Sequence, residues 1–457
     1  MKRYSWRSVA VAALSGAALV GLAACGNGDP GGPGAPTEGA SGDGSTGGDG
    51  VVTVEIWQNQ FQPNDNAWFE GAVKAFNDAH TDVQVNLVVV PGDAWEQKMK
   101  AAQAAGKTPD AYTRNYSAIQ PAARGGELGS LTEYFDASAW TDLDERFLEA
   151  VTVDGAQYAY PIYYEPSSLL FFRKDLWTSA GLDPSDPPAS WDELIGAAQT
   201  LKSAHPDVVP FQTAQNAVEL SWTTWGMQIN AAGHRPISDD WTTSLAGGDE
   251  YRPLFETYKT LMDEGLLAKQ ALTGYGDLSA LAEGKIAMQA SGSWAINQLL
   301  DEYPDVVENI EIAPLPSLDG DLTKTTGTLG GWAFVMDAKS THPKETAEAI
   351  SFMTAEDTAI PLDYFVKTNF TKLSPRNSVA EELSAMDTSV DPWYETVIDV
   401  SQYQVLEPTY DWAVSIAIGT ALEKVMQGGD VSEAIAEADA AITKAIADLK
   451  LPDQLNR

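Results

Sequence analysis

The stretch VTVEIWQNQFQPNDNAWFEGAVKAFNDAHTDVQVNLVVV, residues 52–90, decides the fold class of this chain. Apolar and polar residues alternate over Val52–Ile56, which is typical of a strand with one buried face. Over Phe69–Phe76 the apolar residues recur at helical spacing, which indicates an amphipathic helix. Residues 83–89 alternate again. We therefore expect a strand, a helix and a second strand, an order that favours parallel pairing through a right-handed crossover.

Strand and helix signals continue along the rest of the chain, and together they predict an α/β fold. Ser190-Trp191-Asp192-Glu193 is a capping box that starts a helix. Alternation predicts strands at Ile286–Ala290 and Trp332–Met336. Helical spacing predicts further helices at Trp95–Ala102, at Val218–Ile229 with an end at Gly233, at Leu278–Leu281, after Pro343, at Val414–Val425 and at Ile435–Leu449.

The composition limits the classes of function. The chain has 457 residues, with 28 Lys and Arg against 65 Asp and Glu, for a net charge of −37. This length predicts two or three domains. A nucleic-acid-binding protein needs a basic surface, so the charge argues against one, whereas it favours a soluble monomer. A single cysteine excludes intrachain disulfides, cysteine-rich zinc sites and iron–sulfur clusters.

The first 50 residues predict export and a lipid anchor. Basic residues at positions 2, 3 and 7 precede an uncharged apolar run, residues 9–24, which is typical of a signal peptide. The run ends in Leu22-Ala23-Ala24-Cys25, which resembles a bacterial lipobox. We expect residues 1–24 to be a lipoprotein signal peptide, with Cys25 lipidated as the membrane anchor. Residues 25–50 are rich in Gly and Pro and are expected to be a flexible linker.

A search for catalytic and metal-binding motifs finds little. The four histidines have no metal-ligand spacing, and no G-x-S-x-G motif is present. Gly106-Lys107-Thr108 resembles the end of a P-loop, but Ala101 stands where the first glycine belongs. We expect no cofactor and no metal site. The acidic residues are too numerous to reveal a catalytic pair, so an anchored extracellular glycosidase stays an alternative.

The aromatic residues favour a saccharide ligand. The chain has 14 Trp and 16 Tyr, and several tryptophans stand beside glycines or turn residues, as in Gly292-Ser293-Trp294 and Gly330-Gly331-Trp332. A sugar ring has an apolar face that stacks on an indole and hydroxyls that bond to polar side chains. Tryptophans at the ends of strands therefore predict an aromatic-lined cleft. Their number favours an oligosaccharide over a monosaccharide.

The segment YPIYYEPSSLLFFRKDLW, residues 160–177, closely resembles the first interlobe crossover of extracellular solute-binding proteins family 1, the carbohydrate receptors of ABC importers. Phe172-Arg173 departs from the Tyr-Asn pair that many members carry. Further matching motifs follow in the expected order, and the resemblance spans residues 51–450. They are Phe76–His80, Thr108–Asp110, Ala180–Leu182, Ser190–Leu194, Glu283–Met288, Gly292–Trp294, Pro314–Pro316 and Gly330–Trp332.

The resemblance implies a two-lobed periplasmic-binding-protein fold of type II, with the ligand between two α/β lobes. Lobe 1 would comprise residues 51–163 and 313–355, and lobe 2 residues 164–312 and 356–457. Crossovers would lie near Tyr163–Ser167, Ile312–Pro316 and Phe352. The protein would be no enzyme: it would bind a sugar on the outer face of a bacterial membrane, close on it and deliver it to permease subunits.

The resemblance also implies a set of ligand-binding residues. Trp294 is similar to the sugar-stacking tryptophan of the second lobe, and Tyr410 and Trp412 lie in a region that supplies a second platform. Glu165 stands where the family places a hydroxyl-binding carboxylate. The remaining candidates are Asn59, Gln60, Asn115, Tyr116, Tyr163, Trp222, Trp225, Trp332 and Arg376.

Three alternatives to a sugar receptor remain open from the sequence. A receptor for a phosphorylated solute should present clustered Arg or Lys near the cleft, and we find no such cluster at the loops named. A receptor for a polyamine, the other non-sugar solute considered, would need no such cluster of Arg or Lys. A glycosidase should hydrolyse its ligand at two facing carboxylates. An adhesion or scaffold lipoprotein should bind no small molecule.

Overall fold

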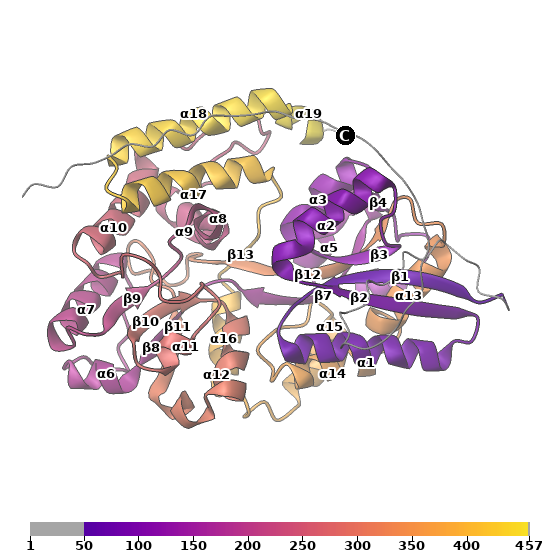
Figure 1. The fold of residues 1–457 in the computed structure, drawn as a ribbon, viewed down its shortest axis with the longest axis horizontal. Helices are drawn as coiled ribbons and strands as arrows, with labels where there is room; N and C mark the ends of the chain where they lie inside the picture. Colours follow the sequence, from indigo (N-terminus) through magenta and orange to yellow (C-terminus); the bar gives the residue numbers. More distant parts are fainter. Residues whose placement is uncertain (1–49, 456–457) are drawn as a thin grey trace, which may run out of the picture. The chain divides into compact units, whose positions relative to one another are not determined.

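The computed structural model describes residues 50–455 and contains two main β-sheets (Figure 1). The larger sheet has seven strands in the order β13-β12-β3-β1-β2, with β4 and β7 also paired to β12. Its strands are β1 (Val52–Asn59), β2 (Val83–Val90), β3 (Ala111–Asn115), β4 (Leu128–Gly129), β7 (Ala159–Pro166), β12 (Thr328–Asp337) and β13 (Val405–Leu406).

The smaller sheet has four strands in the order β11-β8-β10-β9. Strand β8 is antiparallel to both of its neighbours, and β9 is parallel to β10. The strands are β8 (Leu169–Arg173), β9 (Val209–Gln212), β10 (Ile286–Ser291) and β11 (Ile310–Pro314); β5 (Thr152–Val153) and β6 (Ala156–Gln157) form a separate hairpin.

Helices surround both sheets (Figure 1). Five helices lie between β1 and β7 in the chain: α1 (Pro63–Ala79), α2 (Gly92–Ala105), α3 (Tyr116–Arg124), α4 (Ala137–Thr141) and α5 (Glu145–Ala150). Later helices pack with α1 or with one another: α13 (Pro343–Thr354), α14 (Ala359–Lys367) and α15 (Asn377–Ser384). The others are α6 (Lys174–Ser179), α7 (Trp191–Ala204), α8 (Ala217–Thr223), α9 (Trp225–Ala232), η1 (Asp249–Tyr251), α10 (Arg252–Asp263), α11 (Ser279–Ala282), η2 (Ser293–Ala295), α12 (Ile296–Glu302), η3 (Pro304–Asn309), α16 (Tyr394–Ser401), α17 (Trp412–Met426), α18 (Val431–Leu449) and α19 (Leu451–Leu455).

The β-α-β unit expected at residues 52–90 is confirmed. Strand β1 pairs in parallel with β2, in register from Val52↔Val83 to Asn59↔Val90. Helix α1 connects them and buries Phe69 and Phe76, the residues whose spacing predicted it. Parallel pairing does not extend to the whole sheet, because β12 is antiparallel to β3 and to β7. The sheet is therefore mixed.

Local signals in the second half also match the structure, with one difference. The capping box forms: Ser190 Oγ accepts from the Glu193 N–H, and Glu193 Oε2 accepts from the Ser190 N–H. The helical stripe expected up to Gly233 is split at Thr224 into α8 and α9. Thr224 Oγ1 donates to the Leu220 carbonyl at 2.6 Å, and such a bond competes with regular helix.

A few segments connect the strands of one sheet to the strands of the other. Residues 167–168 join β7 to β8, and residues 315–327 join β11 to β12, as expected from the sequence. The crossover expected at the end of the helix around Phe352 stays a prediction: α13 ends at Thr354, and the following α14 packs against α1 and α13. The chain rejoins the larger sheet at β13 and then enters α17, which packs against α8, α10 and α18.

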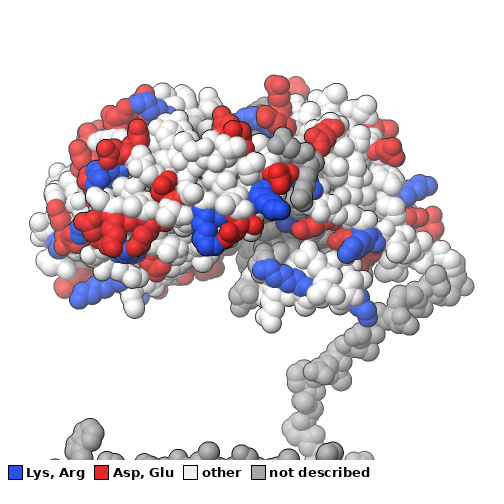
Figure 2. Space-filling model, turned by 90° about the horizontal axis from the view of Figure 1, so that it is seen from above, with Lys and Arg blue, Asp and Glu red and all other residues white. Residues whose placement is uncertain are grey.

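The described residues can be checked for membrane-spanning helices and for surface charge, whereas the expected lipid anchor lies outside them. The signal peptide, Cys25 and nearly all of the linker lie outside the described residues. Within residues 50–455 no helix is long and apolar enough to cross a membrane. Asp and Glu side chains are spread over the face seen in Figure 2, with fewer Lys and Arg among them, as the charge of −37 requires.

Candidate ligand-binding site

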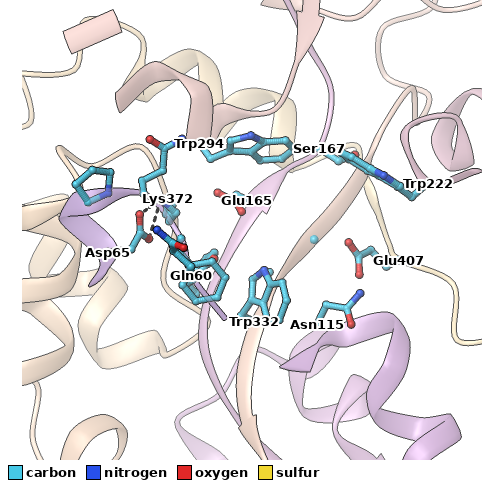
Figure 3. Close-up of a pocket in the computed structure, with 16 residues that line it drawn as sticks. Gln60, Asp65, Asn115, Glu165, Ser167, Trp222, Trp294, Trp332, Lys372 and Glu407 are labelled. Atoms are coloured by element: carbon cyan, nitrogen blue, oxygen red, sulfur yellow. Dashed lines mark hydrogen bonds and ion pairs between the residues drawn. The ribbon is translucent and has the colours of Figure 1, made fainter. Parts of the chain in front are cut away.

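A cavity of about 510 Å³ lies where segments of both sheets meet (Figure 3). Its polar and aromatic lining comes from the start of α1, strands β3, β7 and β12, the helices α8 and η2, and the segments that follow β1, β7, α14 and β13. The lining residues are Gln60, Phe61, Gln62, Pro63, Asp65, Asn115, Tyr163, Glu165, Ser167, Trp222, Trp294, Gly330, Gly331, Trp332, Lys372 and Glu407.

The strand order of the larger sheet brings its polar lining residues together. Strands β1 and β3 are parallel neighbours, so their carboxyl ends meet at one edge of the sheet. Gln60 follows β1, and Asn115 ends β3. Both side chains line the cavity, with hydrogen-bonding groups at that edge.

Three half-buried tryptophans face the cavity from two sides. Trp222 and Trp294 lie on one side with ring centroids 6.1 Å apart, and Trp332 lies on the other (Figure 3). Phe61 supports Trp332 with an edge-to-face contact at 4.9 Å. The gap between the two sides is suited to a flat ligand with an apolar face.

Glycines allow the tryptophans and the neighbouring strands to take these positions. A β-carbon at Gly292 would lie 1.8 Å from the Trp294 ring, so the indole can fold back only over a glycine. Gly331 has φ +146°, and a β-carbon there would lie 2.2 Å from the Tyr163 carbonyl oxygen. The Gly-Ser-Trp and Gly-Gly-Trp motifs thus shape the cavity walls.

One side of the cavity holds a buried ion pair. Lys372 Nζ lies 3.1 Å from Asp65 Oδ1, and both side chains are at most 2% exposed. The Tyr364 hydroxyl donates to the same Asp65 oxygen at 2.6 Å. Lys372 Nζ also lies 5.4 Å from the centre of the Tyr163 ring. The charge of Lys372 is therefore matched within the protein.

The other side holds two carboxylates without such a partner. Among the described residues neither Glu165 nor Glu407 forms an ion pair, and Glu165 Oε2 is buried without a hydrogen bond. Burial raises the pKa of Glu165 to about 8, although Lys372 opposes the shift. Loss of hydration raises the pKa of Glu407 to about 7, against the Ser117 N–H that donates to it. Both groups are thus costly to keep charged in the free protein.

Gly330 lies next to both of these glutamates. It pairs with Glu165 across β12 and β7, and Glu407 follows β13 on the other edge of β12. A β-carbon at Gly330 would lie 2.6 Å from Glu407 Oε1. After burial, the negative charges of Asp65 and Glu407 add to the raised pKa of Glu165, against the opposing effect of Lys372.

Seven of the thirteen ligand-binding candidates from the sequence line this cavity: Gln60, Asn115, Tyr163, Glu165, Trp222, Trp294 and Trp332. Asn59 and Tyr116 lie next to it but outside the lining. The Asn59 N–H donates to Thr113 Oγ1 at 3.0 Å, and the Tyr116 hydroxyl donates to the Tyr163 carbonyl at 2.8 Å. These bonds hold the strands together.

The other four candidates lie outside the lining. Arg376 donates to Asp142 at 2.8 Å and to the carbonyls of Thr354 and Asp357, so its guanidinium is occupied. Trp225 Nε1 donates to Ser415 Oγ at 2.9 Å. Tyr410 is buried in the apolar core around α17, and Trp412 packs edge-to-face on Trp225 while 45% exposed. A role for these residues in binding stays a prediction.

The sequence did not predict Asp65, Lys372 or Glu407. Asp65 and Lys372 are far apart in the chain, and no local motif marks either as a partner of the other. Glu407 follows a strand of two residues, too short to be recognised by alternation. The Gly-Gly of residues 330–331 was the only local hint that another group approaches β12 closely. Within the described residues, no group of three or more potential metal ligands occurs.

Comparisons with known proteins give matches over most of the described chain. The family model described as bacterial extracellular solute-binding protein matches residues 62–360. An sn-glycerol-3-phosphate-binding periplasmic protein of Agrobacterium fabrum is 24% identical, over 66% of this chain and 70% of that protein.

Solved structures show the same fold at low sequence identity. The GacH receptor of Streptomyces glaucescens, solved unliganded and with acarbose, is 21% identical with a TM-score of 0.74, over 87% of this chain and 99% of that one. The cyclic alpha-maltosyl-1,6-maltose binding protein of Arthrobacter globiformis is 20% identical with a TM-score of 0.70, over 87% and 100%. The fold expected from the sequence is confirmed.

Proposed function

Since the chain belongs to the bacterial extracellular solute-binding proteins, the non-enzymatic solute-binding components of ABC transporters, we propose that its solute is a saccharide held in the cavity between the two sheets. The observation that carries this proposal is the trio Trp222, Trp294 and Trp332 on two sides of the cavity. Indoles stack on the apolar faces of sugar rings, and the polar groups between them can bond to the hydroxyls.

The placing of the tryptophans favours an oligosaccharide. Trp222 and Trp294 are neighbours on one side of the cavity, with ring centroids 6.1 Å apart. Two adjacent platforms suit two consecutive sugar rings. Gln60 and Asn115 on the opposite side supply groups that can bond to hydroxyls of either ring.

A phosphorylated solute fits the cavity less well, although the Agrobacterium relative is named for one. Phosphate recognition relies on free Arg or Lys side chains. Lys372 is the one cation among the lining residues, and Asp65 already pairs with it. An ionised Glu165 or Glu407 would repel an anion.

Binding would close two lobes on the ligand. The lobes would follow the ranges 51–163 with 313–355 and 164–312 with 356–457, although α14 and α15 pack with the first of them. A saccharide that touches Trp294 and Trp332 together makes contacts that an open form loses, so it favours closure. The closed form would then deliver its ligand to the permease subunits. Lipidated Cys25 and the linker would keep the monomer at the outer face of the membrane.

Thermal unfolding of the purified protein with a panel of mono- and oligosaccharides, polyols, polyamines and sugar phosphates tests the proposal. A ligand at one hundred times its Kd that binds only the folded state adds about 2.7 kcal/mol to the free energy of unfolding. We expect this stabilisation with a saccharide, and the saccharide should be recovered intact. Stabilisation by a sugar phosphate or a polyamine alone would contradict the proposal.

A further inference from the structure

The charged groups of the cavity are distributed unevenly. Its lining has three carboxylates, from Asp65, Glu165 and Glu407, and a single cation, Lys372. Figure 3 shows the Asp65–Lys372 pair at one end, Glu407 at the other and Glu165 between them. Lys372 is paired with Asp65, so among the described residues Glu165 and Glu407 have no ion-pair partner of their own, although Lys372 is close enough to lower the pKa of Glu165.

The Glu165–Glu407 side is a built site with open acceptors. Glu165 is 6% exposed, and its Oε2 has no hydrogen-bond partner. Glu407 Oε2 accepts a hydrogen bond from the Ser117 N–H at 3.3 Å, and the Ser117 side chain also hydrogen-bonds to this carboxylate. A buried polar atom without a partner costs free energy, so it is normally kept only where a ligand or water will satisfy it.

The chemistry of two neighbouring carboxylates defines what satisfies them best. A hydroxyl supplies one donor and no charge, whereas an ammonium group supplies three donors and a positive charge. Hydrogen bonds between charged groups are about twice as strong as neutral ones. A phosphate or carboxylate at this place would add a further negative charge. Once Glu165 and Glu407 have released their protons, the order of preference is cationic, then neutral, then anionic.

On the basis of the saccharide-binding function proposed above, we propose that the ligand carries a protonated amine, which binds at the Glu165–Glu407 side while its sugar rings stack on the tryptophans. The ligand class is thus an amino sugar or an oligosaccharide that contains one. Glu165 and Glu407 act as the residues that determine specificity, and the Asp65–Lys372 side receives uncharged hydroxyls.

Titration calorimetry with matched saccharides tests this inference. The probes are glucose and glucosamine, galactose and galactosamine, and cellobiose and the β-1,4-linked glucosamine disaccharide, with glucuronic acid as the anion. We expect at least one amine to bind about tenfold or more tightly than its neutral counterpart, and glucuronic acid to bind least. We expect Glu407→Gln and Glu165→Gln to reduce the preference to less than about threefold.

Control variants and the neutral probes separate the outcomes. Glu133→Gln removes an exposed carboxylate that does not line the cavity and should leave the preference unchanged. If neutral saccharides bind and no amine exceeds its counterpart, the inference is overturned while the saccharide function stands. If the preference survives both glutamine variants, the assignment to Glu165 and Glu407 is overturned. If no saccharide of either panel binds, the proposed function fails and this inference fails with it.

Discussion

Asp65 and Glu165 are buried carboxylates of the same cavity, but their surroundings differ. Asp65 has Lys372 Nζ at 3.1 Å and accepts a hydrogen bond from Tyr364, whereas Glu165 Oε2 has no partner. The first arrangement is complete without a ligand. The second leaves acceptors that a bound molecule can satisfy, with Glu407 adding more negative charge nearby.

This difference separates a structural role from a binding role within one site. A buried ion pair ties together elements that meet at the cavity, here α1 and the segment after α14. Unpaired buried carboxylates weaken the free protein, so they are informative as candidates for ligand contact. Variants that change only the Asp65–Lys372 pair, or only Glu165 and Glu407, test whether the two roles are separate.

The largest expected effect comes from breaking the Asp65–Lys372 pair. Lys372→Met leaves Asp65 buried without a cation, so we expect the free energy of unfolding to fall by about 3–5 kcal/mol. Urea denaturation without ligand measures this loss. The double variant Asp65→Asn/Lys372→Met should recover part of it, because no lone charge stays buried. A loss below about 1 kcal/mol in the single variant would show that the pair does not hold the structure.

The next effect is the pH dependence caused by Glu165. The pKa of Glu165 is about 8 in the folded protein against 4.5 when unfolded, so the folded form binds more protons between these values. The stabilisation that this proton gives is complete below pH 4.5 and is lost as the pH rises through 8. Between pH 5 and 8 we expect Glu165 alone to account for a loss of about 3 kcal/mol.

Unfolding of the ligand-free protein at pH 5, 6, 7 and 8 measures this dependence. Glu165→Gln should remove the Glu165 share of about 3 kcal/mol and leave the shares of Glu407 and Asp391, whose pKa values burial raises to about 7. A Glu165→Gln variant that loses as much stability as the parent protein between pH 5 and 8 would refute the assignment.

The features that could be predicted from the sequence are those that depend on the spacing of nearby residues. The β-α-β opening, the capping box at Ser190 and the tryptophans of the two glycine motifs all depend on residues close together in the chain. Trp294 and Trp332 were candidates because each stands beside glycine in a recognisable motif, and in the structure the Trp294 ring folds back over Gly292. The family resemblance supplied the two-sheet architecture that such spacing alone does not.

Long-range pairing explains what the sequence could not predict. Asp65 meets Lys372 only after both segments have folded, and neither neighbourhood differs from that of a surface residue. Conversely, Arg376 and Trp225 have residue types that suit a ligand, but their hydrogen bonds go to Asp142 and Ser415. The type of a residue indicates what it can bind, and its partner in the fold decides whether it is free to do so.

The tryptophans allow the binding role to be tested independently of charge. Trp294→Ala and Trp332→Ala each remove a stacking face, and we expect the affinity for the saccharide identified by screening to fall about 10–100-fold. Trp225→Ala is the matched control, since its indole is buried and bonds to Ser415. It should lower thermal stability and change affinity less than threefold. A larger loss of affinity in Trp225→Ala than in Trp294→Ala would contradict the cavity assignment.

The smallest expected effect is also the most local, and it concerns Gly330. A β-carbon at this position would lie 2.6 Å from Glu407 Oε1, so Gly330→Ala must displace the end of that flexible side chain. The backbone is within reach of an L-residue there, since Gly330 lies in β12 and has no positive φ. We expect stability to change by less than about 1 kcal/mol and ligand affinity to fall about threefold. Gly71→Ala, on the exposed face of α1 with open space around it, is the control and should bind as the parent does. If Gly330→Ala also binds as the parent does, Glu407 can move without cost to the ligand, and the unpaired side would reduce to Glu165 alone.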